Sequence, residues 1–163
     1  MKVFITGGTG NIGQYVTLTA VANGHEAVVL SRNPEKHPSL AKKAVLVKGA
    51  ITDYDLLAKY VKDCDAVIQI ALGWGNEPVS MLNNDTAATV NLLEISEKAG
   101  VGKFIYTSST AAMGVMRNGM DETAVNLPID LYGSTKSASE AYVLGFTKYY
   151  GGKGEVAIRS IRI

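Results

Sequence analysis

Tyr132 and Lys136 have side chains and a spacing that suit general acid–base chemistry. Residues four apart on a helix share one face, so the phenol and the ammonium would lie close together. An ammonium beside a phenol favours the phenolate and lowers a pKa that starts near about 10. Such a pair is suited to moving a proton to or from a substrate hydroxyl near neutral pH. The same pair is common in helices that do no chemistry, so its weight depends on the motifs that accompany it.

A glycine-rich segment near the N-terminus supplies the first of those motifs. It lies between a predicted strand and a predicted helix, which is the context that dinucleotide binding requires. Gly7 permits a tight turn, Gly10 lets the backbone approach a pyrophosphate, and Gly13 lets the helix pack closely on the strand. The N-terminus of the helix then offers free N–H groups and a positive dipole end to phosphate. The candidate dinucleotide-binding residues of this segment are Gly7, Thr9, Gly10, Asn11, Ile12 and Gly13.

The end of the second predicted strand bears on which dinucleotide is bound. An NAD-binding unit usually places an acidic residue there, which holds the ribose 2′-hydroxyl. This sequence carries Ser31-Arg32-Asn33 instead, and the Arg32 guanidinium is suited to a 2′-phosphate. The segment therefore predicts NADP as the cofactor, with NAD as the alternative. The other interpretation of Arg32 is a solvated loop residue.

The elements that must position these residues alternate along the whole sequence. Short aliphatic runs predict strands, and longer segments bounded by capping residues or glycine predict helices. The predicted strands are Lys2–Thr6, Ala27–Leu30, Ala44–Val47, Ala66–Ile70, Lys103–Thr107 and Glu155–Arg159. The predicted helices are Asn11–Asn23, a helix capped by Asp53 and running to about Lys62, Val79–Ala99 and Leu131–Tyr150. This order predicts an α/β fold: a doubly wound parallel sheet of Rossmann type, with about six strands, helices on both faces and one domain over residues 1–163.

The motifs together resemble those of the extended short-chain dehydrogenases/reductases, also called the NAD-dependent epimerase/dehydratase family. The resemblance covers the entire chain, and its markers are the glycine-rich segment, Asn91-Leu92-Leu93-Glu94, Phe104-Ile105-Tyr106-Thr107-Ser108-Ser109 and Tyr132-Gly133-Ser134-Thr135-Lys136. It implies that Tyr132 is the general acid/base, that Lys136 binds the nicotinamide ribose and tunes Tyr132, and that Ser109 hydrogen-bonds the reacting oxygen. The implied activity is NAD(P)-dependent hydride transfer, by an oxidoreductase or an epimerase/dehydratase, on a small-molecule substrate. The resemblance also implies cofactor contacts at strand ends by Ala50, Ile51, Ala71, Leu72 and Thr107.

Several positions depart from the family's pattern, and after the fourth predicted strand Ala71-Leu72-Gly73-Trp74 replaces the family's stretch of small residues. Ala50 stands where the family usually has an aspartate that meets the adenine, Asp85 where it commonly has asparagine, and Met113 where it usually has tyrosine. None of these positions belongs to the implied Ser-Tyr-Lys set. The departures therefore affect inference about the substrate more than inference about catalysis.

Several interpretations of function remain open on the sequence. The family normally continues into a C-terminal substrate-binding region that is absent from these 163 residues. The chain is a catalytic oxidoreductase or epimerase, a fragment that needs a partner to complete its substrate pocket, or a non-catalytic NADP-binding and redox-sensing module. A further alternative is a scaffold whose two long helices mainly make a dimer interface. In this family the helices Val79–Ala99 and Leu131–Tyr150 commonly pair between two copies, so the resemblance also implies a possible homodimer.

The composition bears on several other classes of protein: those that bind nucleic acid, membranes or metals, and those held together by disulfides. The net charge of +1 predicts no general attraction to nucleic acid or to an anionic membrane. A single cysteine, Cys64, cannot form a disulfide framework within the chain, and two isolated histidines predict no metal site. No run approaches the roughly 18 apolar residues of a membrane helix. The sequence therefore predicts a cytoplasmic protein.

Overall fold

Strands and helices alternate in the structure in the order that the apolar segments predict. The structure, a computed structural model, describes residues 1–73, 77–150 and 157–161. The strands are β1 (Lys2–Thr6), β2 (Glu26–Ser31), β3 (Val45–Lys48), β4 (Ala66–Gln69), β5 (Lys103–Thr107) and β6 (Ala157–Ile161). The α-helices are α1 (Asn11–Ala22), α2 (Pro38–Ala41), α3 (Tyr54–Val61), α4 (Pro78–Met81), α5 (Ala88–Lys98) and α6 (Leu131–Tyr150). Two 3-10 helices, η1 (Pro34–Lys36) and η3 (Thr110–Met113), and a π-helix, η2 (Leu82–Ala87), complete the described elements.

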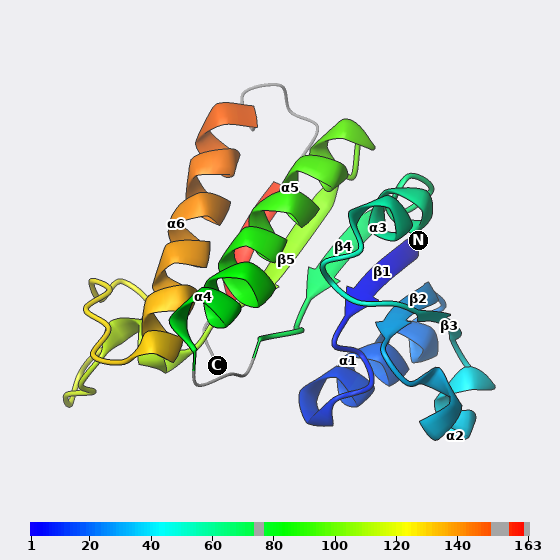
Figure 1. The fold of residues 1–163 in the computed structure, drawn as a ribbon, viewed down its shortest axis with the longest axis horizontal. Coiled ribbons are helices and arrows are strands. Elements are labelled where there is room, and N and C mark those ends of the chain that lie inside the picture. Colours follow the sequence, from blue (N-terminus) through cyan, green and yellow to red (C-terminus); the bar gives the residue numbers. More distant parts are fainter. Residues whose placement is uncertain (74–76, 151–156, 162–163) are drawn as a thin grey trace.

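The strands form one parallel sheet in the order β3-β2-β1-β4-β5-β6 (Figure 1). The chain runs outward from β1 to β3 on one side and then from β4 to β6 on the other. The order therefore reverses between β1 and β4, and ligands of such sheets bind beyond the carboxyl ends of the strands at this point. At that end β1 leads into Gly7 and β4 leads toward Ala71, so the predicted phosphate turn lies at the reversal.

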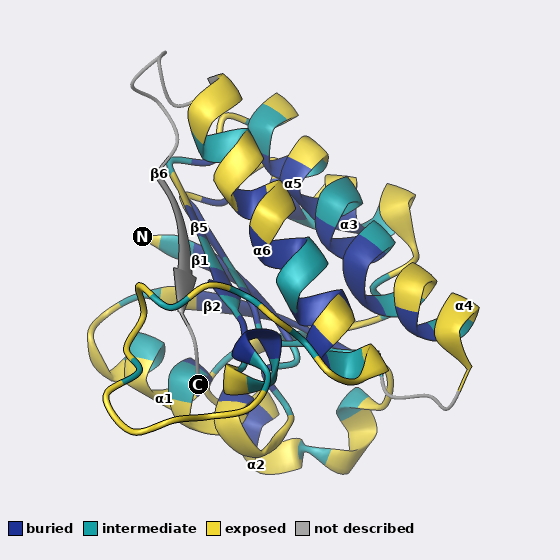
Figure 2. Cartoon of the chain, turned by 90° about the vertical axis from the view of Figure 1, so that its left-hand side faces the viewer, coloured by how far each residue is buried: buried dark blue, intermediate teal, exposed yellow. Residues whose placement is uncertain are grey.

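Helices cover both faces of the sheet (Figure 2). On β1, Phe4 packs with residues of α3, α5 and α6, including Leu57, Leu92 and Val143. Its neighbours Val3 and Ile5 point to the other face, where Val21 of α1 packs against them. Successive strand residues are buried on opposite faces, which is why the strands are apolar throughout rather than alternating. The prediction of a doubly wound parallel sheet with helices on both faces is confirmed.

The ends of several elements differ from the prediction. β4 ends at Gln69, one residue before the predicted end, and α5 ends at Lys98. The last strand is Ala157–Ile161 and extends two residues beyond the predicted Arg159, while the predicted start at Glu155 lies outside the described residues. The predicted cap of α3 is confirmed, because the Asp53 side chain accepts a hydrogen bond from the backbone N–H of Leu56 at 3.2 Å.

The long predicted helix Val79–Ala99 is interrupted. It begins at Pro78 and changes to π-helical hydrogen bonding over Leu82–Ala87 before continuing as α5. Such π segments within α-helices occur frequently at functional sites. Here the segment contains Asp85, whose side chain is fully buried.

The single cysteine, Cys64, is buried. The Cys64 thiol donates to the carbonyl oxygen of Tyr60 at 3.1 Å, and burial raises its pKa to about 11. A thiol with so high a pKa is a poor nucleophile near neutral pH. None of the helices that the structure describes is both long enough and apolar enough to cross a membrane.

Candidate active site

The turn between β1 and α1 is shaped by glycines that have no room for a side chain. Gly7 has a φ of +71°, and a Cβ there would lie 2.5 Å from the backbone nitrogen of Ala71. At Gly13 a Cβ would lie within van der Waals overlap, 2.0 Å from the carbonyl oxygen of Gly7. Gly10 closes the turn by donating its backbone N–H to the Gly7 carbonyl oxygen at 3.0 Å. The glycine pattern is therefore explained by backbone geometry at two of its positions.

The first turn of α1 presents its N–H groups to solvent at the end of the sheet. In an α-helix the N–H groups of the first turn have no partner within the helix. Among the described residues no side chain caps this helix, and its first turn, which begins with Asn11 and Ile12, contains no acidic residue. Asn11 and Ile12 are both exposed. This arrangement fits a bound phosphate, which would accept hydrogen bonds from these groups and meet the positive end of the helix dipole.

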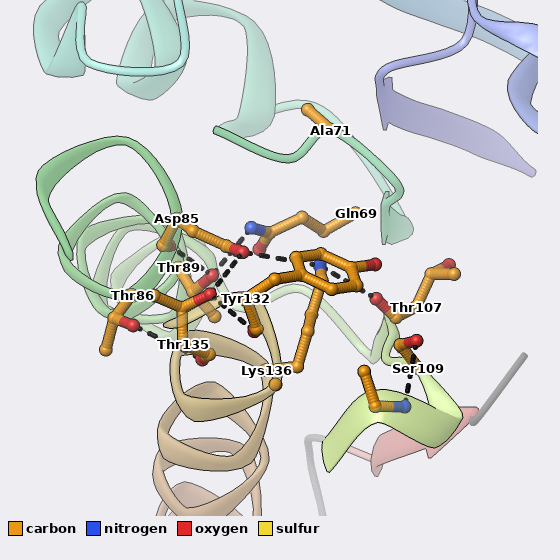
Figure 3. Close-up of polar contacts among 12 residues, drawn as sticks. Gln69, Ala71, Asp85, Thr86, Thr89, Thr107, Ser109, Tyr132, Thr135 and Lys136 are labelled. Carbon is orange, nitrogen blue, oxygen red and sulfur yellow. Dashed lines mark hydrogen bonds and ion pairs between the residues drawn. The ribbon is translucent and has the colours of Figure 1, made fainter. Parts of the chain in front are cut away.

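The start of α6 brings Tyr132 and Lys136 together, as their spacing predicts (Figure 3). The Lys136 Nζ lies 5.8 Å from the centre of the Tyr132 ring and 4.9 Å from that of Tyr106. The same ammonium donates to the carbonyl oxygen of Thr107 at 3.3 Å. The helix begins here because Asp130 accepts a hydrogen bond from the N–H of Gly133 at 2.6 Å.

Ser109 lies beside the end of β5, on the side toward which the Tyr132 hydroxyl points (Figure 3). Its Oγ accepts a hydrogen bond from the backbone N–H of Ala111 at 3.2 Å, which caps η3. A hydroxyl that accepts in this way still has its own O–H to donate. Ser109 is partly exposed, whereas the preceding Ser108 is buried. Of the two serines, Ser109 is therefore the one that a substrate oxygen can reach.

The Lys136 ammonium also forms an ion pair that sequence reasoning did not identify. It lies 3.5 Å from Oδ2 of Asp85, and both side chains are buried. Burial raises the pKa of the Asp85 carboxyl, while Lys136 and the Thr135 hydroxyl act in the opposite direction. Burial likewise lowers the pKa of Lys136, against the charge of Asp85. Each residue therefore opposes the effect of burial on the other.

Other buried polar residues around this pair were also missed. Gln69 at the end of β4 donates to the Thr89 hydroxyl at 2.7 Å, and that hydroxyl donates to the Asp85 carbonyl oxygen at 2.7 Å. Thr135 donates to Asp85 Oδ2 at 3.2 Å. The signal that could have located this cluster is the presence of Gln69 and Asp85 within segments that are otherwise buried and apolar.

The remaining candidates lie at the ends of strands. Arg32 is exposed directly after β2, and the backbone N–H of Gly49 donates to the Ser31 carbonyl oxygen at 3.0 Å, which brings the loop after β3 beside it. In that loop Ala50 is exposed and Ile51 is partly buried against the core on the α3 side. After β4, the backbone N–H of Ala71 donates to the Thr6 carbonyl oxygen at 3.2 Å. Ala71 and Leu72 are both partly exposed. All of these residues follow the carboxyl ends of the strands, where the glycine turn also lies.

The comparison with known families agrees with this geometry. A model described as the NAD dependent epimerase/dehydratase family matches residues 3–160. The chain belongs to this family. Its relatives include both epimerases and dehydrogenases, so the chain is a member of an enzyme family.

Two curated relatives represent these activities. The chain is 28% identical over 159 residues to UDP-glucose 4-epimerase from Rhizobium meliloti, covering 92% of this chain and 48% of the relative. It is 33% identical over 159 residues to 3 beta-hydroxysteroid dehydrogenase/Delta 5-->4-isomerase from Mycobacterium tuberculosis, covering 88% and 42%. The chain thus spans about half the length of the curated relatives it matches.

Solved structures share the fold over nearly the whole chain. UDP-glucose 4-epimerase from Thermotoga maritima, solved with UDP-glucose, superposes with a TM-score of 0.85 at 26% identity, covering 99% of this chain and 54% of that one. The enzyme from Brucella ovis, solved in complex with NAD, gives a TM-score of 0.82 at 26% identity, covering 99% and 50%. The dinucleotide in this neighbour is NAD, so the comparisons give no support to the predicted preference for NADP.

Proposed function

We propose that the protein is an NAD(P)-dependent oxidoreductase or epimerase in which Tyr132 moves a proton at a substrate oxygen. The single observation that carries this proposal is the meeting of Tyr132, Lys136 and Ser109 at the sheet end that also holds the uncapped N-terminus of α1. A proton-transfer group and a phosphate-binding turn at one sheet edge are what nicotinamide-dependent chemistry on an alcohol or carbonyl needs.

Tyr132, Lys136 and Ser109 each have a separate role in the proposed reaction. Tyr132 gives a proton to the substrate oxygen in one direction and takes it in the other. Lys136 places its charge beside the Tyr132 ring, and its third N–H is available for a ribose hydroxyl because an ammonium has three donors. Ser109 donates its O–H to the same substrate oxygen and so holds the reacting carbon in place. A bound nicotinamide would supply the hydride acceptor or donor.

The phosphate end of the proposed site rests on the glycine turn. Gly7, Thr9, Gly10, Asn11, Ile12 and Gly13 would hold the pyrophosphate, chiefly through the backbone N–H groups at the start of α1. Ala71 and Leu72 would line the cofactor on the β4 side, Thr107 on the β5 side, and Ala50 and Ile51 the adenine end. The Ala71 position is supported by its direct contact with Gly7, because a Cβ on Gly7 would collide with it.

The substrate is a small molecule with a hydroxyl or carbonyl carbon that accepts or loses hydride. Two of the relatives are named for UDP-glucose and for 3 beta-hydroxysteroids. An assay of the complete protein with NAD and NADP against UDP-hexoses and hydroxysteroids, following the absorbance of reduced nicotinamide and the epimer ratio, tests the proposal. Dinucleotide binding with no hydride transfer or epimerisation over the panel would favour the redox-sensing alternative.

Arg32 is expected to favour NADP over NAD. The side chain is exposed at the end of β2, where a 2′-phosphate would lie if the dinucleotide occupies the glycine turn. A charge-assisted hydrogen bond of this kind contributes about 1–3 kcal/mol. Arg32→Ala should therefore weaken NADP binding by roughly tenfold or more and leave NAD binding nearly unchanged, as measured by calorimetric titration.

Lys36→Ala provides the matched control, because Lys36 is an exposed cation four residues further along the chain, at the end of η1. It should change neither affinity appreciably. Equal affinities of the unmutated protein for NADP and NAD would contradict the proposed preference.

A homodimer through α6 is also proposed, on the basis of its outer face. Tyr142, Gly145, Phe146 and Tyr149 recur at helical spacing and line a shallow groove. The Tyr142 side chain is 50% exposed and that of Tyr149 is 80% exposed. A Tyr142→Glu substitution should shift the mass measured by light scattering from that of a dimer to that of a monomer. A monomer before substitution would refute the assignment.

A further inference from the structure

The ion pair between Asp85 and Lys136 is unusual for its burial. Asp85 has no exposed surface, Lys136 is 1% exposed, and Oδ2 and Nζ lie 3.5 Å apart. Asp85 stands where the resemblance to the family predicts asparagine, so the carboxylate is a feature of this chain rather than of the shared motif.

The structure holds this carboxylate from several elements (Figure 3). The π-helix η2 carries Asp85, the Thr135 hydroxyl of α6 donates to its Oδ2 at 3.2 Å, and the Thr86 hydroxyl donates to the Thr135 carbonyl oxygen at 3.3 Å. These contacts join η2 to the turn of α6 that carries Lys136. The carboxylate is therefore placed by the same contacts that place the lysine.

A lysine buried to this extent would favour the neutral amine without a neighbouring negative charge. The groups around the pair are Gln69 from β4, Tyr106 from β5, and Tyr132 and Glu140 from α6. Gln69 is uncharged, and the pKa of Tyr106 is raised, mainly by burial and then by the charge of Asp85, so both stay neutral. Glu140 already accepts a hydrogen bond from the Asn126 side chain at 2.8 Å. Asp85 is thus the acidic residue that pairs with the Lys136 ammonium in the described part of the chain.

We propose that Asp85 is a positioning residue, whose carboxylate keeps Lys136 protonated between the Thr107 carbonyl and Tyr132, so that dinucleotide affinity stays constant through the neutral pH range. The inference rests on the proposed role of Lys136 at the cofactor ribose. An amine would still reach the ribose but would neither carry a charge nor hold the same hydrogen bonds. The carboxylate therefore acts on the cofactor through the lysine and does not touch the cofactor.

The test compares dinucleotide affinity from about pH 6 to about pH 9 in matched variants. Asp85→Asn keeps the shape and removes the charge, so its affinity for NAD or NADP, whichever binds more tightly, should fall as pH rises and Lys136 loses its proton, by up to about tenfold per pH unit. Asp63→Asn is the matched control, because it makes the same change at an exposed aspartate after α3, away from Lys136. Its affinity should be as constant with pH as that of the unmutated protein.

A second set of variants tests whether Asp85 acts through Lys136. In a Lys136→Met background, adding Asp85→Asn should leave the pH dependence unchanged, since the charge it acts on is already gone. An equal pH dependence in the unmutated protein and in Asp85→Asn, or an effect that persists in the Lys136→Met background, would overturn the proposal.

The unmutated protein alone provides the final measurement. NMR at neutral pH should show an ionised Asp85 carboxyl and a slowly exchanging Lys136 ammonium, the latter assigned by its loss in Lys136→Met. A protonated carboxyl beside a neutral amine would overturn the proposal even if Asp85→Asn does not fold. Failure of the unmutated protein to bind either dinucleotide would refute the proposed function, and the spectrum would still decide whether Asp85 holds the charge of Lys136.

Discussion

Tyr132→Phe in the complete protein is expected to lower turnover by roughly 10²–10⁴-fold, the contribution of general acid–base catalysis. The substitution removes the hydroxyl that would move the proton and keeps the ring that packs beside Lys136, whose Nζ lies 5.8 Å from the ring centre. Dinucleotide affinity should therefore change little, and the loss should appear in kcat and in kcat/KM to a similar extent.

Tyr142→Phe is the matched control for that substitution. It removes a phenol hydroxyl from the same helix, α6, at a half-exposed position ten residues further along. Its turnover should be close to that of the unmutated protein. If Tyr132→Phe retains full turnover, another residue moves the proton and the proposed mechanism is wrong.

Gly13→Ala should abolish measurable dinucleotide binding or weaken it by at least about a hundredfold. The new Cβ would lie 2.0 Å from the Gly7 carbonyl oxygen and 2.6 Å from the Gly8 Cα, and both are backbone atoms that cannot rotate away. The turn must therefore move relative to α1, which displaces the N–H groups proposed to meet the pyrophosphate. Overpacking of this kind also costs about 1–3 kcal/mol of the free energy of unfolding, which chemical denaturation would measure.

Gly145→Ala separates the geometric effect from the general effect of replacing glycine. Nothing lies within 4 Å of a Cβ at this position in the middle of α6. Alanine there should leave dinucleotide binding unchanged, because Gly145 lies on the proposed dimer face of α6 and not in the glycine turn. Normal affinity in Gly13→Ala would show that the turn tolerates a side chain and that the phosphate site lies elsewhere.

The sequence predicted those parts of the site whose chemistry follows local spacing. A Tyr-x-x-x-Lys pair on a helix must share one face. The turn needs a positive φ at Gly7 and leaves no room for a Cβ at Gly13, so both positions require glycine. The Asp53 cap is predictable for the same reason, since it depends on residues within three positions. The parallel sheet with helices on both faces was likewise predictable from the alternation of strands and helices, whereas the order in which the strands pair was not predicted.

The parts that the sequence did not predict depend on contacts between distant segments. Asp85 was noted only as a departure from a family pattern, because its partner lies 51 positions away on another helix. The buried amide of Gln69 likewise bonds a residue 20 positions along the chain. The extra hydrogen-bond register of η2 was not predicted either, because the weak helix formers in Leu82–Ala87 do not by themselves specify a π turn.

The π-helix makes the position of Asp85 depend on chain length as well as on residue type. A π turn accommodates one residue more than an α turn, and each α-helical residue rotates the chain by about 100°. Removing a single residue from Leu82–Ala87 would let the segment revert to a regular helix. The side chains inside the segment, Asp85 among them, would then take new positions on the helix surface, while α4 and α5 kept nearly their present faces. In an alignment of related sequences, a one-residue gap in this segment would therefore matter more to the buried charge than many substitutions around it.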